Sequence, residues 1–397
     1  MLKDKNIVLA VTGSIAAYKM ANVASALVKQ HANVTVMMTQ NATNFINPIT
    51  FETLTGNKCL VDTFDRNFQY SVEHVALANS ADVVLIAPAT ANVIAKLANG
   101  LADDMLTTTV LACRCKKIVS PAMNTNMFEN PITQYNIDKL KKFGFEIIEP
   151  ASGRLACGDV GAGKLPAEEI LLDYIYKEIM FDKILSGKKV LVTAGPTKEA
   201  LDPVRYISNH STGKMGYSLA KVASYMGAEV TLVSGPVALQ SPNFVNCVKV
   251  VSAKDMYEAV MSKADETDII IMAAAVADYT SPVVADSKLK KKDQDMSISL
   301  ARTKDILATL GEKKHEKQFL CGFSMETDNL LDNSSAKLVK KNADMIVANS
   351  LRDAGAGFGT DTNIVTLITR DGAETLPIMS KDKVSAKILE DIVKRMN

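Results

Sequence analysis

The sequence predicts an α/β protein built from two doubly wound domains in tandem, each a parallel sheet covered by helices on both faces. Its 397 residues exceed one ordinary domain and favour two or three. Short unbroken apolar segments alternate with helical stretches, which is typical of parallel strands buried on both faces. A polar connection, Ser186-Gly187-Lys188-Lys189, separates two such arrays. We therefore expect one domain over residues 1–187 and a second over residues 188–397.

The first array contains five predicted strands, and the first of them leads through a glycine turn into a helix that ends near Lys29. These strands are Asn6–Val11, Val34–Met38, Asp82–Ala87, Lys117–Ser120 and Glu146–Ile148. A helix over Glu168–Lys183 then leads to the polar connection.

The second array also contains five predicted strands, with a helix near Met215–Met226. These strands are Lys189–Thr193, Glu229–Ser234, Asp268–Ala274, Gln318–Phe323 and Asp344–Ala348. In doubly wound folds ligands bind at the carboxyl ends of the strands, so the segments that follow these strands are the candidate sites.

Composition excludes several classes of protein. Lys plus Arg number 45 and Asp plus Glu 44, and this balance argues against a dedicated nucleic-acid binder, which usually has a basic excess. No apolar run approaches the roughly 18 residues of a membrane span, and the first residues lack the layout of a signal peptide. The six cysteines include no CxxC pair, so we expect neither a disulfide framework nor a zinc site, and we predict a cytoplasmic protein.

The first candidate site is the turn Gly13-Ser14-Ile15, which lies between a strand and a helix. Glycine permits a tight turn, and the following helix offers free N–H groups to an anion. The segment is not GxGxxG, so a dinucleotide is not indicated. A mononucleotide phosphate site and a plain tight turn remain equally good interpretations.

Further candidates lie along the same array. His74 stands at the start of an amphipathic helix, where a lone histidine is more often structural, and Thr90 follows a strand. Asn124 lies in a segment that we expect to be a constrained loop, and its amide suits a carboxylate or the edge of a flavin. A glycine-rich stretch over residues 152–164 carries Cys157 and could act as a mobile lid.

Together these motifs resemble those of the flavin-dependent cysteine decarboxylases, in the same order: GSIAAYK, the histidine, APATAN, PAMNTNMF and ACGD. The resemblance implies a flavodoxin-like domain that forms trimers, with FMN near a subunit interface. It implies FMN contacts at Gly13, Ser14, Ile15, Thr39 and Thr90. Two positions depart from the family: Phe128 replaces the usual Trp, and Lys164 replaces an Arg and loses its bidentate fork.

The resemblance also implies catalytic roles. A carboxylate leaves poorly unless the resulting carbanion has an electron sink, and FMN creates one by oxidising the carbon that bears sulfur. His74 is implied as the base or orienting group in this oxidation. Asn124 would hold the carboxylate or the flavin side of the site, and Cys157 would be the final proton donor.

In the second array, two polar segments follow strands. One contains Asn209 and Ser211-Thr212-Gly213-Lys214, which lacks the GxxxxGK[ST] spacing of a Walker loop. Asn209 and its loop could hold a phosphate or an acyl group, and a solvated loop is the simpler alternative. The other segment contains Asp278, which is well placed to read a base or hold a metal.

Lysines gather in two places in this array. The densest charge run is Lys288, Lys290, Lys291 and Lys292, which is either a solvated loop or a cluster that neutralises a triphosphate. Lys337 and Lys341 lie four apart on a predicted helix and therefore share a face.

The chain from Lys188 onward resembles the phosphopantothenate–cysteine ligases, through AGPT, RYISNHSTGKMG, AAAVADY, KLKK and the segment from Phe323 to the lysine helix. The resemblance implies a Rossmann-like domain that activates 4′-phosphopantothenate with CTP and Mg²⁺. Cysteine would then attack the acyl-cytidylate. The fused order, decarboxylase then ligase, resembles the bifunctional coenzyme A biosynthesis proteins, and implies 4′-phosphopantetheine as product and decarboxylase trimers joined through ligase dimers.

The ligase resemblance also implies individual contacts. Asp278 would read the ribose or base of cytidine, Lys288 would face the triphosphate, and Asn209 would orient the acyl-cytidylate. The remaining implied nucleotide contacts are Met272, Ala273, Ala274, Lys304, Asp305, Ile306, Leu307, Phe323, Lys337 and Lys341. At Thr303-Lys304 the sequence departs from the Asn-Pro of the family.

Two other functions compete with this interpretation. The first is a non-catalytic flavin-binding regulatory subunit, against which His74, Asn124 and Cys157 argue together. The second is a decarboxylase of peptide C-terminal cysteines, which the attached ligase half disfavours. For the favoured interpretation, the expected partners are the small-molecule substrates 4′-phosphopantothenate, cysteine and CTP and further copies of the chain, with neither nucleic acid nor membrane.

Overall fold

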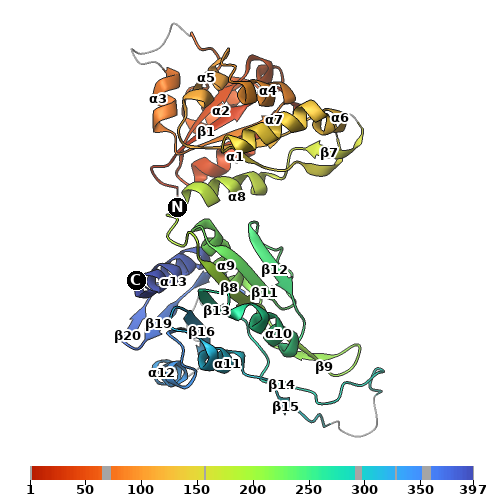
Figure 1. Ribbon diagram of the computed structural model, residues 1–397, viewed down its shortest axis with the longest axis vertical. Coiled ribbons are helices and arrows are strands. Elements are labelled where there is room, and N and C mark those ends of the chain that lie inside the picture. The colour runs from red at the N-terminus through yellow and green to blue at the C-terminus, as the bar shows by residue number, and fades with distance from the viewer. Residues whose placement is uncertain are drawn as a thin grey trace. The chain divides into compact units, whose positions relative to one another are not determined.

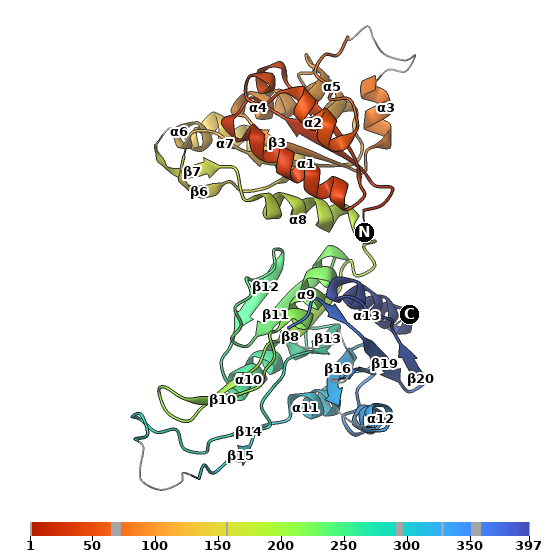
Figure 2. The same ribbon diagram turned by 180° about the vertical axis from the view of Figure 1, so that it is seen from behind.

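The computed structural model describes residues 2–64, 73–155, 158–290, 297–326, 329–350 and 359–396. The chain divides into two compact units, Met1–Asp182 and Lys183–Asn397 (Figures 1 and 2). This division falls a few residues before the predicted domain boundary, at the end of the helix that follows the first array.

The sheet of the first unit has five parallel strands in the order β2-β1-β3-β4-β5. Their bounds are β1 Asn6–Val11, β2 Asn33–Met38, β3 Val83–Ala89, β4 Lys116–Pro121 and β5 Glu146–Ile147. All five predicted strands are confirmed to within a few residues. Successive side chains of a strand point to opposite faces, and β1 therefore contributes Ile7 and Leu9 to one core and Val8 to the other.

Helices cover both faces of this sheet. Apolar residues of α1 (Lys19–Lys29), α2 (Pro48–Thr55) and α8 (Glu168–Ile179) fill the core on one face. Residues of α3 (Glu73–Ser80), α4 (Ala91–Asn99), α5 (Met105–Ala112) and α7 (Pro131–Lys142) fill the core on the other. The unit is completed by η1 (Ile15–Tyr18), η2 (Gln40–Asn44), α6 (Thr125–Glu129) and the antiparallel pair β6 (Ala151–Arg154) and β7 (Val160–Lys164).

The main sheet of the second unit has eight strands in the order β12-β11-β8-β13-β16-β17-β19-β20. Their bounds are β8 Lys189–Ala194, β11 Glu229–Ser234, β12 Val245–Lys249, β13 Ile269–Met272, β16 Phe319–Glu326, β17 Met345–Ser350, β19 Val365–Thr369 and β20 Gly372–Thr375. From β12 to β17 the strands are parallel, with β8, the first in sequence, in the interior. The chain thus leaves β8 toward β11 on one side and later returns to β13 on the other, which opens a crevice at their carboxyl ends.

The second sheet is parallel as predicted, except at one edge, where β19 and β20 pair antiparallel. We predicted five strands here, and β12, β19 and β20 are additional. β20 carries no buried residue and β12 is only half-buried, so neither has the continuous apolar run on which the prediction relied.

Helices also cover both faces of the second sheet. On one face, α10 (Ala253–Ala264), α11 (Ile306–Lys313) and α12 (Leu330–Lys340) share a core with the central strands. Elsewhere α9 (Lys214–Tyr225) packs against β8, β11 and α13 (Lys381–Met396). Short strand pairs extend from the sheet: β9 (Lys198–Ala200) with β10 (Tyr206–Ser208), β14 (Tyr279–Thr280) with β15 (Ala301–Arg302), and β18 (Thr362–Asn363) with β21 (Met379–Ser380). Within the described residues no helix is both long and apolar enough to cross a membrane.

Candidate active sites

The predicted Gly13 turn lies at the carboxyl end of β1 and is tied to the turn after β3. Thr12 Oγ1 donates to Pro88 O at 2.5 Å and accepts from the backbone N–H of Thr90 at 3.0 Å. A Cβ at Gly13 would lie 2.9 Å from the Cβ of Asn41, so only glycine fits without displacing the η2 segment. The structure thus brings Gly13 and Thr90 to one edge of the sheet.

Helix-capping contacts complete this edge. Ser14 is the N-cap of η1 and accepts from the N–H of Ala16, while Thr90 caps α4 and accepts from Val93. Ile15 is exposed at 58%. Ser14 and Ile15 therefore lie at the surface of the turn, as expected of ligand-contacting residues.

Three hydroxyl groups near the carboxyl strand ends of the first unit are buried and have no hydrogen-bond partner within the described parts of the chain. They are Thr39 Oγ1, Ser120 Oγ and Thr125 Oγ1. Buried polar groups normally have partners, so each of these hydroxyl groups calls for a ligand or water. Thr39 was predicted to contact the cofactor. Ser120 and Thr125 were missed, because nothing in the sequence distinguishes them from ordinary strand and helix residues.

Asn124 lies in the short segment between β4 and α6 and is the N-cap of α6, where its side chain accepts from the N–H of Asn126 at 2.9 Å. The predicted constrained loop is helical from Thr125 to Glu129. Its amide nitrogen donates to Asp159 Oδ2 at 2.8 Å. The glycine-rich stretch forms the β6–β7 hairpin and packs on this segment, since Met123 N–H donates to Gly163 O at 2.9 Å. A Cβ at Gly163 would lie 2.3 Å from Met123 O, so the close approach requires glycine.

Of the other two predicted catalytic residues of this unit, the structure describes only His74, which does not lie beside Asn124. His74 is half-buried at the start of α3, which packs on α5, whereas α6 packs on α7 and β7. In both views α3 and α6 stand on opposite sides of the unit (Figures 1 and 2). Cys157 lies outside the described residues.

The second unit collects most of its predicted residues in one cleft at the carboxyl ends of β13 and β16. One cavity of about 590 Å³ includes ten of them in its lining. Those ten are Met272, Ala274, Asp278, Lys304, Asp305, Ile306, Leu307, Phe323, Lys337 and Lys341.

Specific contacts hold the charged groups of this cavity. Lys337 Nζ donates to Phe323 O at 2.8 Å, and Lys341 forms an ion pair with Asp305, the N-cap of α11. Lys304 Nζ lies 4.7 Å from the ring centroid of Tyr257. Burial by itself would raise the pKa of Asp305, but the hydrogen bonds from Lys341 and from the Ala308 N–H outweigh it and lower that pKa. Asp305 is therefore ionised and holds Lys341 at the cavity wall.

A second cavity of about 350 Å³ adjoins the first and shares with it Ala274, Val276, Asp278, Phe323 and Lys337. Ala273 lines only this second cavity, together with the Ser211–Gly216 segment. The turn after β13 is fixed by the Ala274 N–H, which donates to Thr193 Oγ1 at 3.1 Å. Asn209 reaches the same turn, and its amide nitrogen donates to Ala275 O at 3.0 Å.

The second cavity also contains polar residues that we did not predict: Lys214, Asn349, Asn363 and Lys381. Lys381 is 6% exposed and donates to the backbone oxygens of Thr360 and Thr362. Burial, and then the nearby charge of Lys214, lower the pKa of Lys381. The Oδ1 atom of Asn349 is buried without a partner in the described structure. Only Lys214 lay in a motif that we noted, the loop that we expected to hold a phosphate or an acyl group or to be solvated, and we did not single out Lys214 itself.

Lys288 is not among the residues that line either cavity and is exposed in the segment after β14. Its neighbour Leu289 is anchored, because the Leu289 N–H donates to Asp202 Oδ2 at 3.0 Å and Arg205 donates to the Leu289 carbonyl. Lys290 is likewise exposed, whereas Lys291 and Lys292 lie outside the described residues. The role of Lys288 at a triphosphate stays a prediction.

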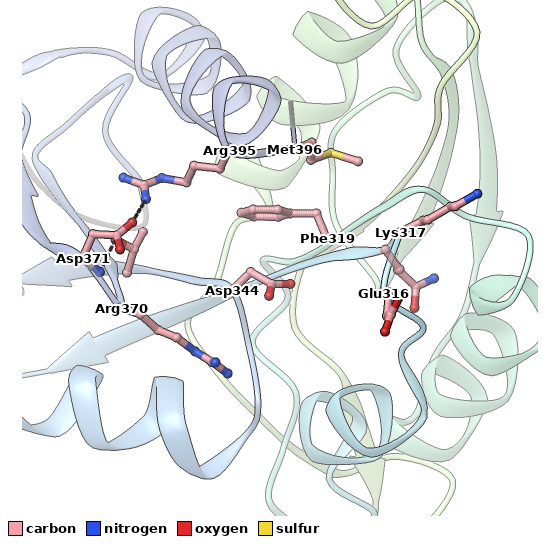
Figure 3. A pocket seen from close by; sticks show the side chains of 10 residues that line it. Glu316, Lys317, Phe319, Asp344, Arg370, Asp371, Arg395 and Met396 are labelled. Atoms are coloured by element: carbon pink, nitrogen blue, oxygen red, sulfur yellow. Dashed lines mark hydrogen bonds and ion pairs between the residues drawn. The ribbon is translucent and has the colours of Figure 1, made fainter.

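A third cavity of the second unit, about 460 Å³, lies at the opposite, amino ends of β16 and β17 (Figure 3). It contains none of the predicted residues. Two of its charged groups pair with each other, Arg395 with Asp371 at 2.8 Å, and Asp344 pairs with Lys314, which is outside the lining, at 2.5 Å. Because ligands of doubly wound sheets bind at the carboxyl ends, we assign the active site to the first two cavities.

Comparison with known proteins also divides the chain into two parts. Residues 1–180 match the family model of the flavoproteins, and residues 185–396 match that of the DNA/pantothenate metabolism flavoprotein C-terminal domain. A coenzyme A biosynthesis bifunctional protein CoaBC from Bacillus subtilis is 48% identical over 99% of this chain and 97% of its own length. The chain belongs to the family of bifunctional coenzyme A biosynthesis proteins. A Vibrio vulnificus protein of the same description is 44% identical over 98% of both chains.

Membership of this family means that the chain is a bifunctional enzyme of coenzyme A biosynthesis, with phosphopantothenoylcysteine decarboxylase and phosphopantothenate–cysteine ligase activities. Its first unit is a flavoprotein domain. Among solved structures, the C-terminal domain of a coenzyme A biosynthesis bifunctional protein CoaBC is 46% identical, with a TM-score of 0.47, over 54% of this chain and 98% of that one. The FMN-dependent cysteine decarboxylase SpaF is 36% identical, with a TM-score of 0.37, over 41% of this chain and 91% of that one.

Proposed function

We propose that the second unit joins cysteine to 4′-phosphopantothenate at the expense of CTP, and that the first unit decarboxylates the product to 4′-phosphopantetheine with FMN. The observation that carries the ligase part is the pair of adjoining cavities with a common wall. A ligase that activates one substrate with a nucleotide needs two binding volumes that meet where the new bond forms. The common wall, which includes Lys337, is that meeting point.

In this proposal the larger cavity binds the nucleotide and the smaller one binds the acyl substrate. Asp278 would accept hydrogen bonds from the cytidine, and Lys304 and Lys341 would face the phosphates. Lys337, on the common wall, would neutralise charge as the substrate carboxylate attacks the α-phosphate. Lys214 and Lys381 give the smaller cavity the positive charge that a phosphorylated substrate requires.

Two further assignments follow from the same cleft. The described residues hold no group of three or more His, Cys, Asp or Glu that could bind a metal, so Mg²⁺ would enter on the triphosphate and keep most of its water ligands. Asn209 is fixed on the turn beneath the common wall and would orient the acyl-cytidylate for attack by cysteine.

The ligase proposal is tested by pyrophosphate release. Release should require CTP and 4′-phosphopantothenate together but not cysteine, because activation precedes transfer. Asn209→Ala should release pyrophosphate and accumulate the acyl-cytidylate, detected by mass spectrometry of the bound ligand. Pyrophosphate release that depends on cysteine would contradict the two-step scheme.

The carboxyl edge of the first sheet fits the phosphate end of FMN. The Gly13 turn and the buried hydroxyl of Thr39 lie at the carboxyl edge of the sheet, and an FMN phosphate would accept a hydrogen bond from that hydroxyl, which has no partner in the described structure. When bound, FMN would supply the electron sink that decarboxylation requires. Asn124 would bind the substrate carboxylate through its amide nitrogen, and Cys157 would deliver the final proton.

His74 stands apart from Asn124 within one chain, and this supports a site shared between two copies. We infer that α3 of one copy brings His74 to the edge where another copy presents Asn124. Such an arrangement requires a homo-oligomer, since one copy alone would have two incomplete halves of a site.

Subunit mixing tests the shared site. Oligomers of His74→Asn alone and of Asn124→Ala alone should be inactive in decarboxylation. Co-expressed mixtures of the two should regain activity, because some sites combine an intact His74 with an intact Asn124. Mixtures of His74→Asn with His74→Ala serve as the matched control and should stay inactive. Failure of the first mixture to exceed the control would place the whole site in one chain.

A further inference from the structure

The first unit has a groove that contains none of the candidate site residues. It is a cavity of about 410 Å³ between the end of α4, the outer side of α5, and α7. It lies where β4 and β5 begin, because Lys117 is at the start of β4 and Phe145 just precedes β5. The candidate flavin edge is at the opposite, carboxyl ends of the strands.

The walls of this groove are mostly apolar, and several of its large side chains face solvent. Leu101, Leu111 and Phe143 are 56%, 62% and 61% exposed. Leu97, Val110 and Phe145 complete the apolar lining. Exposed apolar surface gathered around one cavity is typical of a binding site for an apolar group.

Two lysines lie in this apolar lining. Lys117 Nζ lies 5.3 Å from the ring centroid of Phe145, and Lys139 Nζ lies 6.0 Å from that of Phe143. Their hydrogen-bond partners are neutral: Lys117 donates to Cys113 O at 2.8 Å and Lys139 to Asn99 Oδ1 at 2.9 Å.

Neither lysine forms an ion pair with a carboxylate of the described residues. An ammonium group has three donors, so each lysine keeps hydrogen-bonding capacity for an incoming acceptor. The groove therefore combines an apolar volume with positive charge that no described acidic side chain offsets.

We propose that this groove binds a small organic anion with an apolar body, such as an aliphatic carboxylate, with its head group between Lys117 and Lys139. The apolar body packs on Leu111, Val110 and the phenylalanine rings. The volume lies in the range of small-molecule sites. Charge complementarity selects the anion over a neutral or cationic molecule of the same body.

The test uses three probes with the same alkyl chain: octanoate, octanol and octylammonium. Isothermal titration calorimetry with the flavin-loaded full chain should show octanoate binding most tightly and octylammonium least. Lys117→Met and Lys139→Met should each weaken octanoate about fivefold, the size expected for one partly exposed charge contact, and leave octanol unchanged. Lys142→Met is the matched control, because Lys142 is exposed and lies on α7 like Lys139 but does not line the groove. This substitution should change the affinity for neither octanoate nor octanol.

Other outcomes overturn the proposal. Equal affinity for the three probes would show that the groove does not discriminate between ligands by charge. An equal effect of Lys142→Met would mean that the protein attracts the anion through its net charge and not through this groove. If Leu111→Ser changes the oligomeric state in sedimentation while octanoate binding persists, the groove is a contact between copies of the chain.

Discussion

The two units use the same architecture but assemble their candidate sites differently. In the second unit, segments far apart in sequence converge on two adjoining cavities, and most predicted residues meet there. In the first unit, Gly13, Thr39, Thr90 and Asn124 lie on turns at one edge, whereas the helix that carries His74 packs elsewhere. The difference teaches that the candidate site of the second unit can be complete within a single chain, whereas that of the first unit, in the shared site proposed above, would need a second copy.

The largest expected effect tests whether the two units fold and function independently of each other. A Cβ at Gly235 would lie 1.8 Å from Pro196 O, a backbone clash that no side chain can relieve. Gly235→Ala should lower the free energy of unfolding of the second unit by about 3 kcal/mol and abolish ligation. Flavin content and decarboxylation should be retained.

Gly359→Ala is the matched control, because a Cβ there meets nothing within 4 Å. Two thermal transitions, one shifted and one unchanged, would support independence. Loss of flavin in Gly235→Ala would contradict it.

The next prediction separates the decarboxylase activity from the ligase activity. His74→Asn should reduce decarboxylation by about 10²–10⁴-fold, the usual contribution of a positioned acid or base, because Asn cannot accept a proton. CTP-dependent ligation should continue at the parent rate, since His74 belongs to the first unit. Product analysis should show phosphopantothenoylcysteine accumulating. Decarboxylation within a few-fold of the parent would return His74 to a structural role.

Within the ligase cleft, Lys337→Met should slow pyrophosphate release by about 10²-fold, because it removes a cation from the wall that both cavities share. Lys340→Met is its control on the same helix, because Lys340 is exposed and lines neither cavity. Steady-state rates at saturating CTP measure the difference. Equal effects of the two substitutions would remove Lys337 from the reaction.

The smallest effect concerns the Asn124–Asp159 hydrogen bond. A substrate carboxylate would have to displace the carboxylate of Asp159 from the Asn124 amide. Asp159→Asn should therefore tighten binding of phosphopantothenoylcysteine about threefold, by removing a competing charged acceptor. It should leave 4′-phosphopantetheine, which has no carboxylate, unchanged. Calorimetry with both ligands distinguishes this from a general change in the hairpin, which would shift both affinities.

The strands that the sequence predicted are largely buried, but burial alone did not decide which strands were found, because β19 was missed although all five of its residues are buried. β1 and β11 were predicted with their observed bounds, because each is an apolar run buried on both faces. β20 was missed because all four of its residues are exposed. The helix α6 was predicted as a loop, because five residues are too few to show helical periodicity.

For the candidate sites, individual motifs could be predicted from the sequence, but which of these motifs meet in space could not. Asp278, Lys337 and Lys341 were identified from their own surroundings, and the structure places them on one cleft. Lys381 could not be found this way, because it meets the loop of Lys214 only through the packing of α13 against α9. Nor could the sequence show that α3 and α6 lie apart, since that separation depends on how helices are arranged around the sheet.

Lys214 and Lys381, in the smaller cavity, also affect how the stability of the second unit depends on pH and on bound anions. Lys381 is buried beside the like charge of Lys214, and its pKa is lowered, so at neutral pH the folded unit carries an electrostatic penalty that the unfolded chain lacks. The penalty fades as the pH rises through the lowered pKa and Lys381 loses its proton. An anion entering the cavity would remove the same penalty without deprotonation. The unit should therefore melt at a higher temperature with phosphate-bearing ligands, and this gain should shrink in alkaline buffer.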